Sequence, residues 1–301
     1  IKNLPVTPHL MASLRESAKL ITTHYSTQIE GNRLTQEQVI EVIKNKKVIP
    51  QRKRDENEIK GYYKAIQFVE KFATKKTSIS EEDLNKIHSL VENNKEVKYR
   101  DGQNVITDSS TGEIVYMPPE ATDVPILMKD FIDWLNLDKE TPILIKAGIA
   151  HYQYVTIHPY YDGNGRSARL LTTLILHKNG YDLKGIYSLE EYYAKDLNGY
   201  YNAITVGPSH NYYMGRAEAD LTDWIEYFIQ GVKEAFEKVY EKAKLESGTR
   251  DLSPILRNLD VKQRKILQLF ENQKKITSSD IAEFFNFAPR TARKLAQDWV
   301  E

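Results

Sequence analysis

A twelve-residue stretch at 158–169, which reads His-Pro-Tyr-Tyr-Asp-Gly-Asn-Gly-Arg-Ser-Ala-Arg, constrains this chain of 301 residues more than any other feature. A largely apolar run at 170–176 follows directly, so the stretch predicts a glycine-rich loop that enters a helix. Backbone N–H groups around Gly163 and Gly165 can converge on an anion, and the start of the helix adds the positive end of its dipole. This arrangement favours a bound polyphosphate.

The side chains of the stretch add the groups that phosphoryl or nucleotidyl transfer requires. Arg166 and Arg169 are three residues apart, so they share one helix face and can reach the same anionic ligand. Asp162 can hold a divalent cation on the phosphates, and His158 can take up a proton near neutral pH. A tight turn explains the glycines but not the charged groups around them. We therefore interpret the stretch as a transfer site.

The stretch resembles the Fic family signature, His-x-Phe-x-Asp/Glu-Gly-Asn-Gly-Arg-x-x-Arg, at every position but one. Tyr160 stands where the family usually has phenylalanine. The resemblance implies an enzyme that transfers AMP from ATP to a Ser, Thr or Tyr hydroxyl of a target protein. Tyrosine keeps the aromatic ring but adds a hydroxyl group that needs a hydrogen-bond partner.

The resemblance also implies a role for each residue of the motif. His158 would deprotonate the target hydroxyl, and Asp162 would bind a Mg²⁺ ion that bridges the α- and β-phosphates. Arg166 would hold the β-phosphate and Arg169 the γ-phosphate. The anion hole would consist of the backbone N–H groups around Gly163, Asn164 and Gly165.

A second motif lies far upstream, where Ser-Thr-Gln-Ile-Glu-Gly runs from Ser26 to Gly31. Gly31 is expected to end a helix there in any case. The six residues also resemble the inhibitory pattern Ser/Thr-x-x-x-Glu-Gly/Asn of the Fic family. A carboxylate of Glu30 at this helix end can pair with Arg169 and take the place of the γ-phosphate. We therefore predict that the N-terminal helix restrains the enzyme.

Apolar residues recur at helical spacing along most of the chain, so the predicted fold class is mainly α. The exception is 104–117, where two β-branched runs flank the polar turn Asp-Ser-Ser-Thr-Gly and two prolines follow. In the Fic family, a β-hairpin flap beside the active site aligns the target by strand pairing. The expected strand residues of such a flap are Val105, Ile106, Ile114 and Val115.

Two adjacent tyrosines, Tyr200 and Tyr201, follow the motif. The Fic family places an aromatic pair about here, against the base of the nucleotide, so both residues are candidate ATP contacts. Packing of an amphipathic helix explains either tyrosine equally well.

The helical pattern breaks at 247–254, which we expect to be a linker. The three short helical runs beyond it resemble a helix-turn-helix within a winged-helix-like domain at 255–301. Pro289 suits the first turn of the second helix of the pair, from which Arg290, Arg293 and Lys294 could face DNA. Residues 252–301 carry nine basic and six acidic side chains, a net charge of only +3. DNA binding and protein docking are therefore equal alternatives.

We accordingly expect four parts in the chain. They are an N-terminal helical region with the inhibitory helix at 1–92, a Fic core with a trailing helix at 93–246, the linker at 247–254 and the helix-turn-helix domain at 255–301.

Composition excludes several other classes of protein. With 42 basic and 42 acidic residues, the chain has no net charge that would attract nucleic acid or a membrane. No run is long enough for a transmembrane helix, and no signal-peptide pattern opens the chain. The absence of cysteine excludes disulfides and thiolate metal sites, and it fits a cytoplasmic protein. The composition leaves open whether the chain forms a homo-oligomer.

The leading hypothesis is a protein adenylyltransferase that uses ATP and Mg²⁺ and is inhibited by its own Glu30. The same scaffold could transfer another nucleotide or a phosphoryl group, or it could remove AMP from a modified protein, with Glu30 orienting water. The alternative from another class is a DNA-binding regulator that acts through 255–301, with the core as a sensor.

Overall fold

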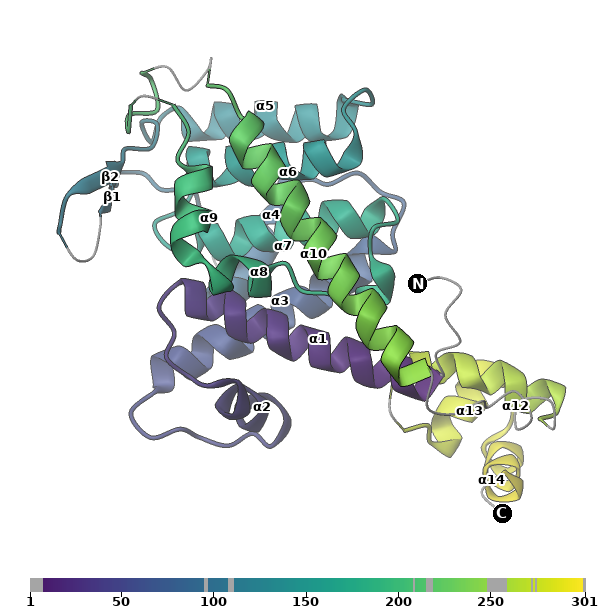
Figure 1. Cartoon of the computed structure of the whole chain (residues 1–301). Helices are drawn as coiled ribbons and strands as arrows, with labels where there is room; N and C mark the ends of the chain where they lie inside the picture. Colours follow the sequence, from purple (N-terminus) through teal and green to yellow (C-terminus); the bar gives the residue numbers. More distant parts are fainter. Residues whose placement is uncertain are drawn as a thin grey trace. The chain divides into compact units, whose positions relative to one another are not determined.

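The computed structural model describes most of the chain, namely residues 8–94, 97–107, 111–207, 209–214, 219–247, 259–271, 273 and 275–299. Within these residues the fold is helical apart from one two-stranded sheet, which confirms the predicted fold class (Figure 1). The chain divides into two compact units. The larger is Lys19–Ala235, and the smaller combines Ile1–Ala18 with Phe236–Glu301.

The larger unit is built around α7 (Asn164–Lys178), which packs against α3 (Lys53–Ala73), α4 (Glu81–Val91) and α6 (Ile143–Ile157). The other helices that lie wholly in this unit are α2 (Gln36–Lys44), α5 (Val124–Leu137), the short η1 (Leu183–Gly185), α8 (Glu190–Lys195) and α9 (Leu197–Ile204). Two long helices, α1 (Pro8–Ile29) and α10 (Thr222–Ser247), begin in one unit and end in the other. Among the described residues, no helix combines the length and the apolarity needed to cross a membrane.

Helix α7 is buried along most of its length, its polar residues included. Leu170, Leu171 and Leu174 are completely inaccessible to solvent. The two threonines between them are also buried, since each hydroxyl donates to a carbonyl one turn earlier. Thr172 Oγ1 lies 2.9 Å from Ala168 O, and Thr173 Oγ1 lies 3.1 Å from Arg169 O. The motif residues at the start of this helix are therefore held by the best-packed element of the unit.

Two of the surrounding helices begin at capping boxes. Thr35 caps α2 in a reciprocal pair of hydrogen bonds with Gln38, and Ser80 caps α4 in the same way with Asp83. Each box satisfies N–H groups that a helix start would otherwise leave without a partner. These local signals set the start of α4, whose other end reaches the motif.

The sheet is an antiparallel hairpin of β1 (Ile106–Thr107) and β2 (Ile114–Tyr116). Ile106 pairs with Tyr116 and Thr107 pairs with Ile114, so Val115 is the extra residue of an irregular register. The prediction that Val105 is a strand residue is wrong, because Val105 lies before β1. The ladder ends at Ile106 because Met117, the residue after β2, uses its backbone groups elsewhere. The N–H of Met117 donates to His210 O, and its carbonyl accepts from Tyr212 N.

The hairpin is anchored at one end and exposed along its strands. Tyr116 is buried, and its hydroxyl donates to the carbonyl of Thr156 in the last turn of α6. By contrast, Ile114 is 47% exposed and Val115 is 37% exposed. The strands project from the helices of their unit, as Figure 1 shows. The side chains of these two apolar strand residues are therefore partly open to solvent.

The C-terminal helices have a small core of their own. These helices are α12 (Val261–Ile266), η2 (Leu267–Glu271), α13 (Ser278–Phe285) and α14 (Pro289–Asp298). Ile266, Ile281 and Ala292 form the buried centre. Asn286 ends α13 in the left-handed conformation, with φ of 53°, and a proline opens α14.

This helix order agrees with a helix-turn-helix, and Arg290, Arg293 and Lys294 are exposed on α14. No strand occurs in the described part of 259–299, so the winged-helix likeness is not confirmed. Ser247 is the last residue of α10, and the rest of the expected linker, 248–254, lies outside the described residues. The predicted division into four parts stays a prediction.

The burial of α7 predicts the cost of a cavity in it. Leu174→Ala should lower the free energy of unfolding by about 2–5 kcal/mol, because the lost side chain leaves a void that close-packed helices cannot fill. The control is Leu137→Ala at the end of α5, where Leu137 is 76% exposed. This variant should change the free energy of unfolding by less than about 0.5 kcal/mol. Urea denaturation would measure both variants, and equal losses would contradict this account of the core.

Candidate active site

His158 occupies the C-cap of α6 in a left-handed conformation, with φ of 52° and ψ of 60°. Its N–H closes the last turn by donating to Tyr154 O at 3.1 Å. The ring Nδ1 lies 3.2 Å from Val155 O. Because a carbonyl can only accept, Nδ1 carries the proton and Nε2 keeps its lone pair. Burial lowers the pKa of His158 to about 4, so the imidazole is neutral at neutral pH and can act as a base.

The loop between His158 and α7 is closed by its own asparagine. Asn164 Oδ1 accepts from the N–H of Tyr160 at 3.0 Å, and Asn164 Nδ2 donates to the carbonyl of the same residue at 2.8 Å. Gly163 follows with φ of 72° as the N-cap of α7. A Cβ at Gly163 would lie 2.5 Å from Glu92 Oε1 and 3.1 Å from His88 Cε1. Both the conformation and the close packing therefore require glycine there.

The start of α7 leaves backbone N–H groups for an anion. The N–H of Gly163 donates to Asp162 Oδ1 at 2.6 Å, so this group, which the sequence assigned to the anion hole, binds the neighbouring carboxylate. The first hydrogen bond of the helical ladder runs from Ser167 N to Gly163 O at 3.0 Å. The N–H groups of the residues between them precede that ladder and can meet a phosphate. Those residues are Asn164, Gly165 and Arg166.

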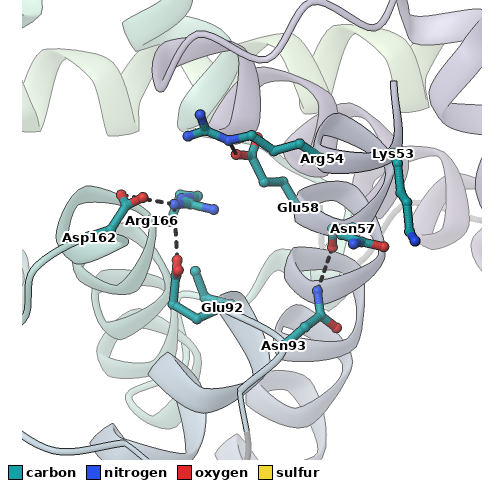
Figure 2. A pocket seen from close by; sticks show the side chains of 9 residues that line it. Lys53, Arg54, Asn57, Glu58, Glu92, Asn93, Asp162 and Arg166 are labelled. Atoms are coloured by element: carbon teal, nitrogen blue, oxygen red, sulfur yellow. Dashed lines mark hydrogen bonds and ion pairs between the residues drawn. The ribbon is translucent and has the colours of Figure 1, made fainter. Parts of the chain in front are cut away.

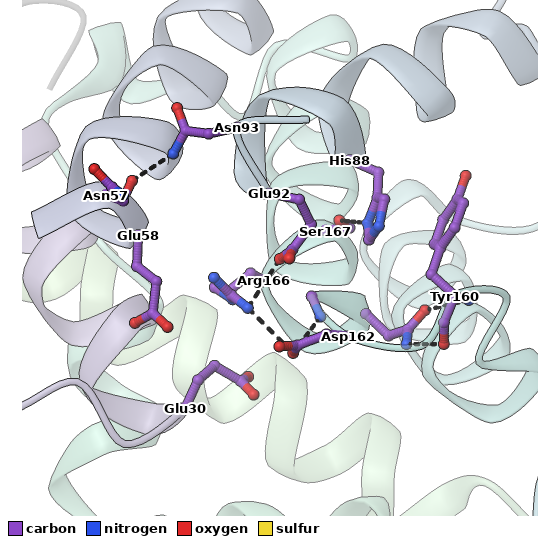
Figure 3. A network of polar contacts seen from close by, with 12 residues as sticks. Glu30, Asn57, Glu58, His88, Glu92, Asn93, Tyr160, Asp162, Arg166 and Ser167 are labelled. Atoms are coloured by element: carbon purple, nitrogen blue, oxygen red, sulfur yellow. Dashed lines mark hydrogen bonds and ion pairs between the residues drawn. The ribbon is translucent and has the colours of Figure 1, made fainter. Parts of the chain in front are cut away.

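Arg166 is 2% exposed and lies between two carboxylates. Its Nη2 is 3.2 Å from Asp162 Oδ1 and 3.0 Å from Glu92 Oε1, as Figure 3 shows. Burial raises the pKa of Glu92, while Arg166 opposes that rise. Within the described residues, Arg166 Nε has no hydrogen-bond partner. Glu92 belongs to neither sequence motif, so sequence reasoning missed it.

Arg169 of α7 contacts the end of α1, where it meets a glutamate 139 residues away along the chain. Its Nε donates to Ser26 Oγ, and its Nη2 donates to both Ser26 O and Glu30 Oε1, all at 2.8 Å. Arg169 is 2% exposed, and burial alone would lower its pKa, but Glu30 raises it on balance and keeps the guanidinium charged. Gly165 has no side chain to obstruct this contact, since a Cβ there would collide with Glu30 Oε1. The structure thus brings together the two motifs that are distant in sequence.

Tyr160 has a partner for the hydroxyl group that phenylalanine would lack. The ring stacks on His88 at a centroid distance of 3.6 Å, and the hydroxyl donates to Asn85 Oδ1. His88 Nδ1 pairs with Ser167 Oγ at 3.0 Å, and burial lowers the pKa of His88 to about 3. The aromatic residue therefore packs the loop against α4.

The two candidate tyrosines have different surroundings. Tyr200 is 3% exposed, pairs with His151 Nε2 at 2.9 Å and stacks on Tyr193. Tyr201 is 45% exposed, and its hydroxyl donates to Ile29 O at 3.4 Å, next to Glu30. Helix packing accounts for Tyr200, so only Tyr201 presents a ring that a nucleotide base could contact.

A cavity of about 390 Å³ opens beside the motif, between α3 and the end of α4 (Figure 2). Its walls carry three basic and three acidic side chains. Arg166 and Asp162 are shared between this cavity and the motif. The lining residues are Lys53, Arg54, Asn57, Glu58, Val91, Glu92, Asn93, Asp162 and Arg166.

Comparison with known proteins agrees with this geometry. Residues 78–176 match the Fic/DOC family. This part of the chain is a Fic domain. The matched region contains the motif at 158–169, the hairpin and α4, whereas the inhibitory motif at 26–31 lies upstream of it.

Relatives of this Fic domain are named as adenylyltransferases. The protein adenylyltransferase fic-1 of Caenorhabditis elegans is 33% identical over 192 residues, which cover 62% of this chain and 37% of that protein. The protein adenylyltransferase Fic of Nematostella vectensis is also 33% identical, over 167 residues that cover 52% of this chain and 37% of the relative. The chain therefore spans little more than a third of the length of these relatives.

Solved structures show the same fold. A Fic family protein from Desulfovibrio desulfuricans superimposes with a TM-score of 0.65 and 27% identity, covering 96% of this chain and 79% of its own. A Fic domain protein from Bacteroides thetaiotaomicron gives a TM-score of 0.65 at 22% identity. The match covers 78% of this chain and 91% of the chain of that protein. The resemblance of the sequence to the Fic family is thereby confirmed.

The hydroxyl of Tyr160 should contribute measurably to stability. Tyr160→Phe removes one hydrogen bond and should lower the free energy of unfolding by about 1 kcal/mol. Asn85→Leu in the Tyr160→Phe background should lower the free energy of unfolding little further, because the hydroxyl that bonds to Asn85 is already absent. A double-mutant cycle by chemical denaturation measures this coupling, and strictly additive losses would show that the two side chains act independently.

Proposed function

We propose that this protein is an adenylyltransferase that moves AMP from ATP to a hydroxyl group of a target protein. The observation that carries the proposal is a neutral histidine with a free Nε2 beside a helix start that holds two buried arginines. Such a site combines a proton acceptor with fixed positive charge, which in-line attack on a phosphate requires. The names of the relatives support ATP as the nucleotide.

The transfer would proceed in one displacement. The target hydroxyl gives its proton to Nε2 of His158 while its oxygen forms a bond to the α-phosphorus. The bond from that phosphorus to the oxygen that bridges to the β-phosphate breaks, and pyrophosphate leaves with the electron pair. The N–H groups at the start of α7 and the guanidinium groups of Arg166 and Arg169 would stabilise the charge on the phosphates.

Asp162 is suited to a metal ion that arrives with the nucleotide. Its side chain is 60% exposed, and within the described residues only Oδ1 is engaged, with Gly163 N and Arg166. No group of three or more potential metal ligands gathers anywhere in the described residues. A single carboxylate fits Mg²⁺, which commonly takes its remaining ligands from substrate phosphates and water. When bound, Mg²⁺ would neutralise phosphate charge.

Glu30 would restrain this reaction by competing with the nucleotide. Its carboxylate is paired with the guanidinium that we assign to the γ-phosphate, at 2.8 Å. Two anions cannot both occupy that donor, so a triphosphate must displace Glu30 or bind with its α-phosphorus out of line. Because Glu30 is 29% exposed while Arg169 is buried, the glutamate is the partner that can move away.

The hairpin would receive the target. The exposed Ile114 and Val115 on β2 offer an apolar edge to an extended peptide, which could pair with the strand and bring its hydroxyl to His158. The relatives and structures described above give no support to the alternative of a DNA-binding regulator. The partner of α12–α14 is left unassigned.

Removal of Glu30 should release activity. Glu30→Gly should raise automodification with α-³²P-ATP by about 5- to 150-fold, the usual range of a coupling free energy between two ligands. His158→Ala should abolish the label in both backgrounds, because it removes the group that we assign as proton acceptor. Glu41→Gly, which removes a partly exposed carboxylate that pairs with Lys47, is the control and should leave labelling unchanged.

Two outcomes of this experiment would contradict the proposal. Equal labelling of the wild type and Glu30→Gly would remove the inhibitory role. Mass spectrometry of the product should show the added mass of AMP, and a different added mass would assign the transfer to another nucleotide or to a phosphoryl group.

The activity should depend on pH through His158. The imidazole accepts a proton only when it is neutral, and burial lowers its pKa to about 4 from an ordinary value of 6.5. Labelling by Glu30→Gly should therefore persist well below pH 6.5 and decline only as the pH falls toward about 4. An NMR titration of the His158 ring would give the midpoint directly, and a midpoint near 6.5 would contradict the buried, neutral state.

A further inference from the structure

Arg100 is a buried arginine that lies outside both sequence motifs. It is 2% exposed, and it binds the loop that carries His158 through two hydrogen bonds. The Nε of Arg100 donates to His158 O at 2.9 Å, and its backbone N–H donates to Pro159 O at 3.0 Å. These bonds fix the peptide groups that follow the strained, left-handed His158.

The other end of the same guanidinium holds both ends of the hairpin. Nη1 donates to Gly102 O at 3.1 Å and to Gln103 Oε1 at 3.0 Å, just before β1. Nη2 donates to Pro119 O, just after β2. Gln103 then crosses between the two segments, since its Nε2 donates to Pro118 O at 2.9 Å. One side chain therefore joins the base to the two chain segments from which the hairpin extends.

The chemistry of this contact argues against a merely space-filling role. All the acceptors of Arg100 in these bonds are carbonyl or amide oxygens, and burial lowers its pKa. A buried cation without a hydrogen-bonded carboxylate is costly, and an apolar side chain would fill the same space at lower cost. A planar fork with five donors is suited to joining several carbonyls in one fixed geometry, which lysine cannot reproduce.

We propose that Arg100 is a positioning residue that sets the hairpin relative to His158, so that a hydroxyl held by the hairpin meets Nε2. The proposal rests on the proposed function for its consequence in catalysis. Tyr116 supplies a second tie on the same side, from β2 to Thr156 O in the last turn of α6. Arg100 differs from Tyr116 because it reaches the histidine residue itself.

The first test is kinetic and uses Arg100→Lys in the Glu30→Gly protein. Lysine keeps the charge but cannot span both segments, so kcat for automodification should fall by about 10- to 100-fold, as expected for a misplaced reacting group. KM for ATP should not change, because Arg100 contacts none of the groups assigned to the phosphates. Gln103→Ala removes one acceptor of Arg100 and the bond from Gln103 Nε2 to Pro118 O, but it leaves Gly102 O and Pro119 O in place, so it should cause a smaller fall in kcat.

Lys146→Met is the control for a loss of stability that follows from changing a buried basic side chain away from His158. Lys146 is 6% exposed, and its Nζ donates to Asp138 O at 2.5 Å near the opposite end of α6 from His158. This variant should lose stability while kcat and KM stay unchanged. An unchanged kcat in Arg100→Lys, or a fall matched by a rise in KM for ATP, would overturn the positioning role.

A second test needs no activity and keeps the two proposals separate. The chain has no cysteine, so a single nitroxide on Val115→Cys would label the hairpin alone. In this protein, paramagnetic relaxation of the His158 ring should weaken on Arg100→Lys and stay the same on Lys146→Met. Equal relaxation in all three proteins would overturn the role of Arg100 even if Glu30→Gly transferred label. A Glu30→Gly protein that transfers no label would contradict only the proposed function.

Discussion

The buried charge of Arg169 is the constraint on which the rest of the site depends. A guanidinium in a helical core is tolerated only when its donors are satisfied, and an unpaired one would cost several kcal/mol. Ser26 and Glu30 at the end of α1 supply the acceptors. Gly165 leaves room for the carboxylate. The contact that we assign to inhibition is thus also a contact that holds α1 against α7.

The same principle applies to the second arginine of the motif. Arg166 meets Glu92 from the end of α4 and Asp162 from its own loop, so both arginines are neutralised by carboxylates. A polyphosphate that binds here exchanges one anion for another and does not have to enter a site with unbalanced charge. Under the proposed function, the affinity for the nucleotide would therefore be a difference between two ion-pair energies. That difference would make the site sensitive to the loss of a single carboxylate.

Much of the motif could be predicted because its chemistry is local. The glycine-rich loop, the helix that follows and the shared face of two arginines all depend on residues within a few positions. Glu92 and Arg100 could not be predicted in this way, since no spacing relates them to the motif. The N–H of Gly163 was also assigned to an anion, but Asp162, its immediate neighbour, accepts it. That outcome depends on a side-chain rotamer, which a residue pattern does not specify.

The sequence by itself determined the helical class, the hairpin, the transfer motif and the presence of an inhibitory pattern, because periodicity and turn chemistry act over short distances. Only the tertiary structure decided that Tyr200 is buried while Tyr201 is exposed, and that Asn85 accepts the hydrogen bond of the Tyr160 hydroxyl. It also decided that Arg100 joins His158 to the hairpin. These choices follow from how helices pack against one another. Contacts between elements far apart in the chain depend on that packing and leave no regular trace in the order of residues.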